Sequence, residues 1–204
     1  QLRRDPDCRD IPVIALAGPR AEERLAAFAA GADDVMTRPT NERLLLARVR
    51  NLLRLKAESD FPTPDALEIT GLETTGLAEV PAAFEPQGMI ALVATQVAPA
   101  EGLRDALAGQ LRDRLVVLSR REALADITAE QGRDTLPEVF ILQDDGQNPS
   151  ATLRLLSELK SHQATRHSAV CVVGPAGEGD EAAMAFDLGA DDAVGPSVTA
   201  EELA

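Results

Sequence analysis

Short apolar runs alternate with amphipathic stretches at both ends of the chain. The runs IPVIALAG (11–18) and HSAVCVVG (167–174) are each followed by a proline and then by an alanine-rich stretch with helical spacing. Apolar runs of this length, bounded by glycine and proline, are typical of buried strands. Each end of the chain therefore predicts a strand, a helix and a second strand, with the two strands parallel and joined by a right-handed crossover.

These two ends are copies of one pattern. GADDVMTRP (31–39) and GADDAVGPS (189–197) begin with the same tetrapeptide, 189 − 31 = 158 residues apart, and the helical stretches before them also correspond. An internal repeat predicts the same local fold for both copies. The copies differ before the proline, where the first has Arg38 and the second has Gly195.

The central and C-terminal part of the chain shows the regular alternation of a larger domain. From Met89 onward five apolar runs alternate with four amphipathic stretches, which predicts a doubly wound α/β fold around a parallel five-stranded sheet. At the far end TAEE (199–202) is a capping-box pattern that opens another helix. We therefore interpret residues 89–204 as a domain that lacks its last helix.

The N-terminal part is shorter and is separated from this domain by a different kind of sequence. Residues 1–56 predict two strands and two main helices, the second helix covering 41–56. Residues 57–88 carry four prolines and no sustained periodicity, so we interpret them as a linker. Because 1–56 supplies half of a sheet, we expect its open edge to be covered by a partner, in a homodimer or a domain-swapped assembly.

Composition narrows the functional classes. The net charge of −14 argues against nonspecific DNA binding, which needs clustered Lys and Arg facing the phosphates. The two cysteines give no disulfide framework and fit a reducing, cytoplasmic location. No apolar run approaches the ~20 residues of a membrane span. We expect a cytoplasmic protein with no nucleic-acid partner and no membrane span.

The motifs of the N-terminal part resemble the C-terminal half of a bacterial response-regulator receiver domain. The resemblance rests on LRRDPDCRDIPVIALAG, GADDVMTRP and LLARVRNLLRLK, and residues from about 88 to 204 resemble a second receiver. Two receivers in tandem, the second degenerate, are similar to the input half of PleD-type diguanylate cyclases, in which a GGDEF domain follows. The resemblance implies a CheY- or flavodoxin-like fold and a role in two-component phosphorelay signalling. Because the catalytic motif is not in these residues, we expect the chain itself not to be an enzyme.

The phosphorylation chemistry of such receivers depends on a small set of side chains. The family accepts a phosphoryl group on an Asp at the end of the third strand and holds Mg²⁺ with an acidic pair after the first strand. In the second domain, Ala94 and Thr95 stand at the acidic-pair positions, Val173 or Gly174 at a hydroxyl position, and Gly195 at the position of a Lys. No metal site is therefore expected there, and Mg²⁺ or a histidine kinase is implied only for an intact first receiver.

The acceptor position itself depends on the register. Counting from Pro137 in PEVFILQ places Gln143 there, which has no nucleophilic carboxylate, and we favour this register. Counting back from Lys160 places Asp144 there instead. With either residue the metal pair and the cation are missing. The resemblance therefore implies a non-phosphorylatable adaptor for dimerisation or domain packing that regulates a C-terminal diguanylate cyclase outside this chain.

The first domain departs less from the family. Arg38 stands at the Lys position, and Ala17 at the position of a Ser or Thr that senses the phosphoryl group. Arg binds phosphate bidentately and does not reproduce the point charge of Lys. The proline that follows the Lys position is usually cis in the family, so Pro39 and Pro196 are the candidates for cis peptides.

The helix 42–56 reverses the sign of the surrounding charge. It carries five basic residues against the single acid Glu42. Two interpretations remain: a solvated face that complements the helix C-terminus, or an interface built on Arg/Asp contacts, as the family resemblance implies. The interface candidates are Arg43, Arg48, Arg50 and Arg54.

Two other functions stay open. The chain could be the receiver part of a transcriptional regulator, or its flavodoxin-like sheet could bind a small cofactor at the carboxyl ends of the strands. Against a flavin, the chain has no Trp or Tyr to stack on the ring. We interpret Asp33, Asp34, Asp191 and Asp192 as loop and strand-start acids and not as metal ligands.

Overall fold

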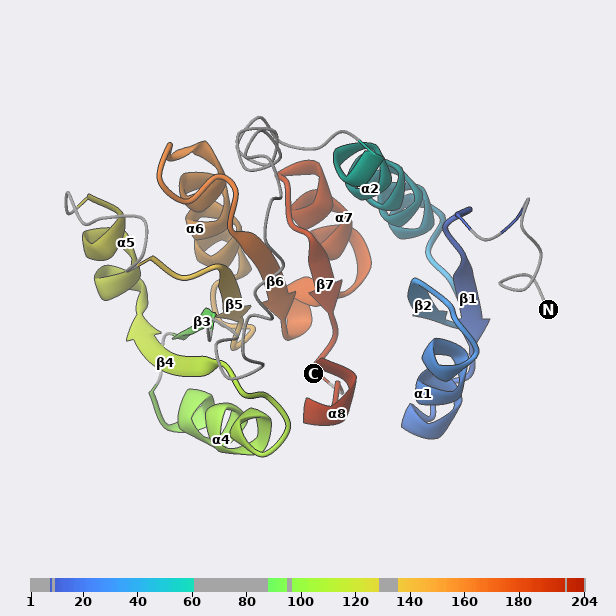
Figure 1. Cartoon of the computed structure of the whole chain (residues 1–204), viewed down its shortest axis with the longest axis horizontal. Coiled ribbons are helices and arrows are strands. Elements are labelled where there is room, and N and C mark those ends of the chain that lie inside the picture. Colours follow the sequence, from blue (N-terminus) through green and yellow to red (C-terminus); the bar gives the residue numbers. More distant parts are fainter. Residues whose placement is uncertain are drawn as a thin grey trace, which may run out of the picture.

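The computed structural model describes residues 8, 10–60, 88–94, 97–128, 136–196 and 198–203. The interior of the expected linker and Thr95 lie outside these residues. The described part contains two parallel sheets, one of two strands near the N-terminus and one of five strands, with helices on both faces of the larger sheet (Figure 1). The expected parallel α/β fold is confirmed.

The N-terminal unit is a strand–helix–strand–helix segment. Its elements are β1 (Ile14–Ala17), α1 (Ala21–Ala29), β2 (Asp34–Thr37) and α2 (Glu42–Asp60). β1 and β2 pair in parallel along their whole length. The Asn41 side chain caps α2 by accepting a hydrogen bond from the Leu44 amide at 3.2 Å. The helix continues past the expected end at residue 56.

The second unit is built around the five-stranded sheet. Its elements, in chain order, are β3 (Met89–Ala94), α4 (Val97–Ala108), β4 (Arg114–Ser119), α5 (Arg120–Thr128), β5 (Val139–Gln143), α6 (Pro149–Ser161), β6 (Ala169–Val173), η3 (Pro175–Gly177), α7 (Gly179–Asp187), β7 (Asp192–Val194) and α8 (Ala200–Leu203). The strand order is β4-β3-β5-β6-β7, and every neighbouring pair is parallel. The central strands β3 and β5 are almost wholly apolar because helices cover both of their faces.

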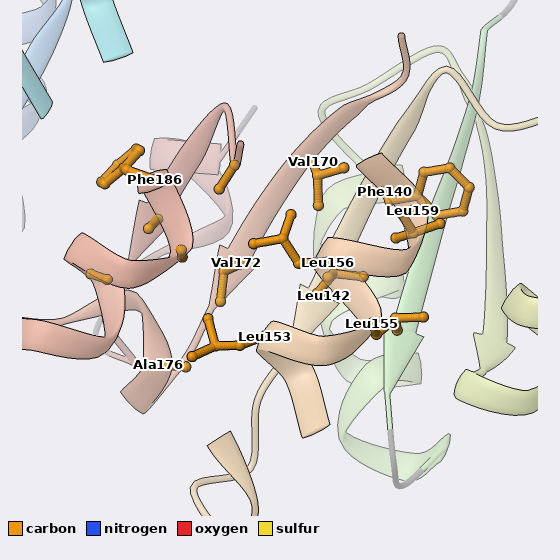
Figure 2. Close-up of a cluster of buried hydrophobic side chains, with 14 of the residues drawn as sticks. Phe140, Leu142, Leu153, Leu155, Leu156, Leu159, Val170, Val172, Ala176 and Phe186 are labelled. Carbon is orange, nitrogen blue, oxygen red and sulfur yellow. The ribbon is translucent and has the colours of Figure 1, made fainter. Parts of the chain in front are cut away.

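The core of the second unit lies on the two faces of this sheet. Successive side chains of β5 point to opposite faces, so that Phe140 and Leu142 join the larger cluster while Ile141 joins the smaller one. In the larger cluster, Leu156 of α6 and Val172 of β6 are fully buried (Figure 2). With aromatic residues at 2% of the chain, leucine, valine and alanine fill most of this space.

The two copies of the repeat share the same helix ends. Gly31 and Gly189 both have positive φ, 95° and 98°, just after α1 and α7. Their amides donate to the carbonyl oxygens of Phe28 and Phe186 at 2.8 and 3.0 Å. Residues with side chains are disfavoured in this conformation. The glycine that opens each GADD therefore follows from the way the preceding helix ends.

The first aspartate of each GADD also has the same role in both copies. Oδ2 of Asp33 accepts a hydrogen bond from the Val13 amide at 2.6 Å, and Oδ2 of Asp191 accepts one from the Val170 amide at 2.8 Å. Each carboxylate holds the beginning of the preceding strand beside its own strand. Both acids lie next to strand starts, where the sequence places them.

Candidate functional site: the strand ends and the arginine interface

The carboxyl ends of the central strands bring the expected acceptor position together with its neighbours. Gln143 is the last residue of β5 and lies opposite Ala94 of β3 and Val173 of β6. The amide oxygen of Gln143 is buried and has no hydrogen-bond partner among the described residues. An amide at this place offers neither a nucleophilic carboxylate nor an anionic ligand for Mg²⁺.

The next residue, Asp144, is buried, with 4% of its surface exposed. Its Oδ2 accepts a hydrogen bond from the Ala176 amide at 2.9 Å, and its Oδ1 accepts one from the Thr152 hydroxyl at 3.3 Å. The Thr152 oxygen in turn accepts a hydrogen bond from Arg120 at 2.8 Å. Both oxygens of the Asp144 carboxylate are therefore engaged by donors that hold α6 and η3 against the end of the sheet.

Two glycines lie at positions that the family resemblance assigns to a hydroxyl (Gly174, with Val173 as the alternative) and to a cation (Gly195). A Cβ on Gly174 would lie 2.3 Å from the backbone oxygen of Asp144, and the φ of Gly174 is 120°, so a side chain is strongly disfavoured there. Gly195 lies against an acid, since a Cβ there would be 1.8 Å from Oε1 of Glu178. Across the described ranges, no three acidic, histidine or cysteine side chains gather as metal ligands.

The two candidate prolines differ from each other. Among the described peptide bonds, the cis bond is Arg38–Pro39. The expectation for Pro196 is corrected, because its bond to Gly195 is not cis. The Val198 amide donates to the Gly195 carbonyl at 3.2 Å, which closes a turn with the proline in its second position. Trans-proline is favoured at that position of a turn.

Arg38 and Ala17 lie together at the carboxyl ends of β2 and β1. The Arg38 amide donates to the Ala17 carbonyl at 3.1 Å, and Nη2 of Arg38 donates to the Leu16 carbonyl at 3.2 Å. The guanidinium group is thus bonded to the backbone of β1, and Ala17 has no hydroxyl to offer. The structure therefore brings the two expected positions together. Arg38 supplies a cation at one position, and Ala17 supplies no hydroxyl at the other.

A buried arginine joins the two units, because α2 packs beside α7 and reaches β7 (Figure 1). Arg48 is 6% exposed. Its Nη1 lies 2.5 Å from Oδ1 of Asp34 and 3.6 Å from Oδ1 of Asp192, and its Nη2 donates to the Ala193 carbonyl at 2.5 Å. The guanidinium carbon lies 5.3 Å from the centre of the Phe186 ring. One arginine therefore contacts the second aspartate of both GADD copies.

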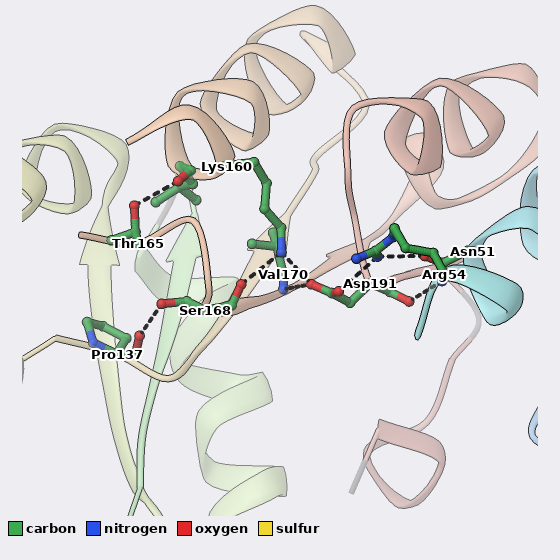
Figure 3. A network of polar contacts seen from close by, with 9 residues as sticks. Asn51, Arg54, Pro137, Lys160, Thr165, Ser168, Val170 and Asp191 are labelled. Carbon is green, nitrogen blue, oxygen red and sulfur yellow. Dashed lines mark hydrogen bonds and ion pairs between the residues drawn. The ribbon is translucent and has the colours of Figure 1, made fainter. Parts of the chain in front are cut away.

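A second set of contacts surrounds Asp191 (Figure 3). Asn51 donates to its backbone oxygen at 2.7 Å, and Arg54 donates to its Oδ1 at 3.1 Å. Lys160 donates to its Oδ2 at 2.7 Å. Burial acts to raise the pKa of Asp191, but the hydrogen bonds from Lys160 and the Val170 amide, with the positive charge of Lys160, bring this pKa below its ordinary value.

The four candidate interface arginines fall into two groups. Arg48 and Arg54 lie in the contact between the units and pair with aspartates. Arg43 lies at its edge, 4.0 Å from Asp180, and Arg50 lines a groove of about 430 Å³ between α2 and α7. The Arg/Asp contacts that the interface interpretation expects are therefore formed within one chain.

Sequence reasoning misses the aspartates of this interface. The sequence interpretation places Asp34, Asp191 and Asp192 in loops and at strand starts, and this position is correct. It does not predict that these aspartates pair with the arginines of α2. The available signal is the sign of the charge, because a basic helix in an acidic chain finds its partners among nearby acids. Burial raises the pKa of Asp192, and the positive charge of Arg48 partly offsets this rise.

The strand order β4-β3-β5-β6-β7, with all strands parallel, defines the second unit as a CheY- or flavodoxin-like α/β domain. No protein-family model matches the chain. A curated relative, the DNA-binding dual master transcriptional regulator RpaA of Synechocystis sp., is 44% identical over 55 residues. These residues make up 26% of this chain and 23% of that regulator, so the match spans less than a quarter of the relative.

Solved structures with a similar fold include response-regulator receivers. The phosphorylated cyanobacterial phytochrome response regulator RcpA is 21% identical, over 57% of this chain and 86% of that one, with a TM-score of 0.45. The response regulator receiver protein from Pseudomonas putida is 20% identical, over 59% of this chain and 94% of that one, with a TM-score of 0.48. At these identities the likeness concerns the fold alone. None of the described helices is long and apolar enough to cross a bilayer.

Proposed function

We propose that this chain is an input module of a two-component response regulator and carries parts of two receivers in tandem. Its second unit serves as an adaptor that takes no phosphoryl group, and the module regulates a diguanylate cyclase domain outside these residues. The observation that carries the proposal is the arrangement around Asp144. That carboxylate is held by two internal donors, and Glu178 faces the position where a cation would stabilise a phosphoryl group.

The electrostatics of the strand ends support this proposal. Transfer of a phosphoryl group to a carboxylate needs positive charge close to the transferring group. The strand ends instead carry the carboxylates of Asp144 and Glu178, and Arg120 reaches Asp144 through the Thr152 hydroxyl. The neighbouring Gln143 adds a neutral amide. A phosphoryl group placed here would meet the Glu178 carboxylate, while the Arg120 guanidinium group is already bonded to Thr152.

The contact between the units supports the adaptor role. An adaptor acts through a surface of fixed geometry and not through a conformational change on phosphorylation. Charge pairs across a contact fix the orientation and register of the two units that they join. Arg48 binds both units from a buried position, and Asp191 is held by donors from both units. We expect the parent protein to dimerise through a module whose two units keep this arrangement.

Exposure to acetyl phosphate and Mg²⁺, followed by intact-mass spectrometry, tests the adaptor role. We expect no phosphorylated species, while a phosphorylatable receiver run in parallel shows that the donor is active. The Asp144→Asn variant is the matched control. A phosphorylated species that disappears in this variant would overturn the proposal, because it would identify Asp144 as an acceptor.

A second candidate function rests on the curated relative, which is a DNA-binding regulator. In this case the same module would control a DNA-binding domain in place of a cyclase. The net charge of −14 argues against nonspecific DNA binding by these residues, so we assign the DNA contact to the other domain. Assay of the parent protein for cyclic di-GMP formation from GTP separates the two functions, since the regulator would form none.

A further inference from the structure

The two outer strands of the five-stranded sheet differ in how their free edges are covered. At β7, Asn51 of α2 donates to the Asp191 carbonyl at 2.7 Å. Arg48 of the same helix donates to the Ala193 carbonyl, which points away from β6. The edge of β7 is therefore blocked by side chains of α2. β4 forms the opposite edge of the sheet, and among the described residues it pairs with β3 alone (Figure 1).

The pairing with β3 shows which backbone groups lie on the free edge of β4. The Arg114 amide donates to the Gly88 carbonyl at 2.9 Å, so Arg114 and every second residue after it bond to β3. The N–H and C=O groups of Leu115 and Val117 therefore point away from the sheet. No described residue forms a hydrogen bond with these outward groups. An edge of this kind is a template for pairing with another strand.

The sequence of β4 offers little protection against such pairing. Natural edges are commonly protected by proline, lysine, a bulge or a very short strand. β4 pairs with β3 over six positions without a bulge, and its middle, residues 115–118, reads LVVL. One protective contact is present at the end of the strand, where Oε2 of Glu122 accepts a hydrogen bond from the Ser119 amide at 2.7 Å. Leu115 and Val117 remain as the open positions.

We propose that the free edge of β4 binds a second copy of this chain, with the two β4 strands antiparallel about a two-fold axis at Val117. In this register the Val117 residues of the two copies exchange both of their N–H···O hydrogen bonds. Val116 lies opposite Leu118 of the second copy, so the paired side chains are apolar. Such an interface is self-complementary, because the same outward groups serve both copies. The inference rests on the dimerising module proposed above and names its surface.

The charged residues at the ends of β4 are compatible with this alignment. Continued past the strand, the alignment brings Asp113 beside Arg121 of the second copy, which pairs opposite charges at both ends. It also brings Arg114 beside Arg120, but the Arg120 guanidinium group donates to the Thr152 hydroxyl of its own unit at 2.8 Å. The net charge of −14 on each copy adds a long-range repulsion that salt screens. Dimerisation is therefore best measured at about 0.15 M ionic strength or above.

Amide hydrogen exchange of the intact chain, followed by NMR at low and high protein concentration, tests the register. Sedimentation equilibrium gives the dissociation constant of the dimer in the same buffer. The Val117 amide should exchange slowly only at the concentrations where the dimer forms. The Val116 amide should be protected at every concentration, because it bonds to β3 within one copy. Alternating protection along β4 distinguishes this interface from a dimer formed elsewhere on the surface.

The Val117→Pro variant removes the outward donor and leaves the hydrogen bonds to β3 in place. It should weaken the dimer by about tenfold or more, because one hydrogen bond is lost from each copy. Val117→Ile is the matched control, since it keeps the donor and a β-branched side chain, and it should dimerise as the unchanged chain does. Far-UV circular dichroism verifies that both variants fold.

A chain that stays monomeric at all concentrations would overturn the inference. A dimer in which the Val117 amide stays unprotected would also overturn it, while leaving the proposed dimerising module in place. If Val117→Pro does not fold, the exchange pattern of the unchanged chain decides the question alone. No phosphoryl transfer is measured, so these results are separate from the test of Asp144.

Discussion

Replacement of Arg48 by alanine measures how much the buried arginine between the two units contributes to stability. Arg48 makes two hydrogen bonds of 2.5 Å, to Asp34 and to the Ala193 carbonyl, at a position where 6% of its surface is exposed. Hydrogen bonds that involve a charged group contribute about 1.5–3 kcal/mol each. Loss of one partner of a buried pair costs about 3–5 kcal/mol, because the other charge is left unpaired. We expect Arg48→Ala to lower the free energy of unfolding by about 3–5 kcal/mol.

Urea unfolding followed by far-UV circular dichroism gives this free energy. The matched control is Arg50→Ala, which removes the same charge from an exposed position on the same helix and should change stability by less than about 0.5 kcal/mol. A double-mutant cycle with Asp34→Ala should show a coupling of about 0.5–3 kcal/mol. A loss below about 1 kcal/mol for Arg48→Ala would refute the reasoning, because that is the range of exposed ion pairs.

Four further substitutions test other parts of the structure. The folded-state pKa of Asp191 lies below its ordinary value of 3.8, so the stability that its carboxylate contributes is present above pH 3.8 and is lost as the pH falls through the folded-state pKa. Urea unfolding at a series of pH values measures this loss of stability, and Asp191→Asn should abolish it. Gly174→Ala should destabilise the protein by about 1–3 kcal/mol, because the φ of Gly174 is 120° and a Cβ would meet a backbone oxygen. Its control, Gly102→Ala in the middle of α4, has open space around the new Cβ and should stabilise the protein by about 0.5–1 kcal/mol. Thermal unfolding compares the two variants, and equal shifts in the unfolding temperature would contradict the backbone argument. Leu156→Ala leaves a cavity in the larger cluster and should cost about 2–5 kcal/mol in the same assay, so a cost under about 1 kcal/mol would contradict its complete burial.

The elements of the fold are predictable because their signals are local. Apolar runs bounded by glycine and proline identify β1 and β6, and the alternation of strands with helices leads to parallel pairing. The end of α2 is less predictable. The change in composition suggests an end at residue 56, but Ala57 and Glu58 are good helix formers, and the helix continues through them to Asp60.

The docking of the units is not predictable in the same way, because it depends on contacts between distant residues. Arg48 binds the Ala193 carbonyl across 145 positions of the chain. The sequence contains a basic helix and several acidic residues, but it does not identify which of these acids form ion pairs with the helix. Counting residues also leaves the register at the end of β5 open by one position. In the structure Gln143 is the last residue of β5 paired with β6, and the Asp144 carboxylate accepts hydrogen bonds from α6 and η3.

The two copies keep the GADD residues that stabilise the local fold and differ at the position of Arg38 and Gly195. Gly31 and Gly189 end a helix, and Asp33 and Asp191 hold a strand start, in the same geometry in both copies. Neither role involves a phosphoryl group, so neither depends on phosphorylation chemistry. The copies differ at the cation position: Arg38 binds the Leu16 carbonyl in the first copy, whereas the second copy has a glycine there that faces an acid and precedes a proline in a turn. The adaptor role proposed above predicts this combination, a retained GADD without the cation.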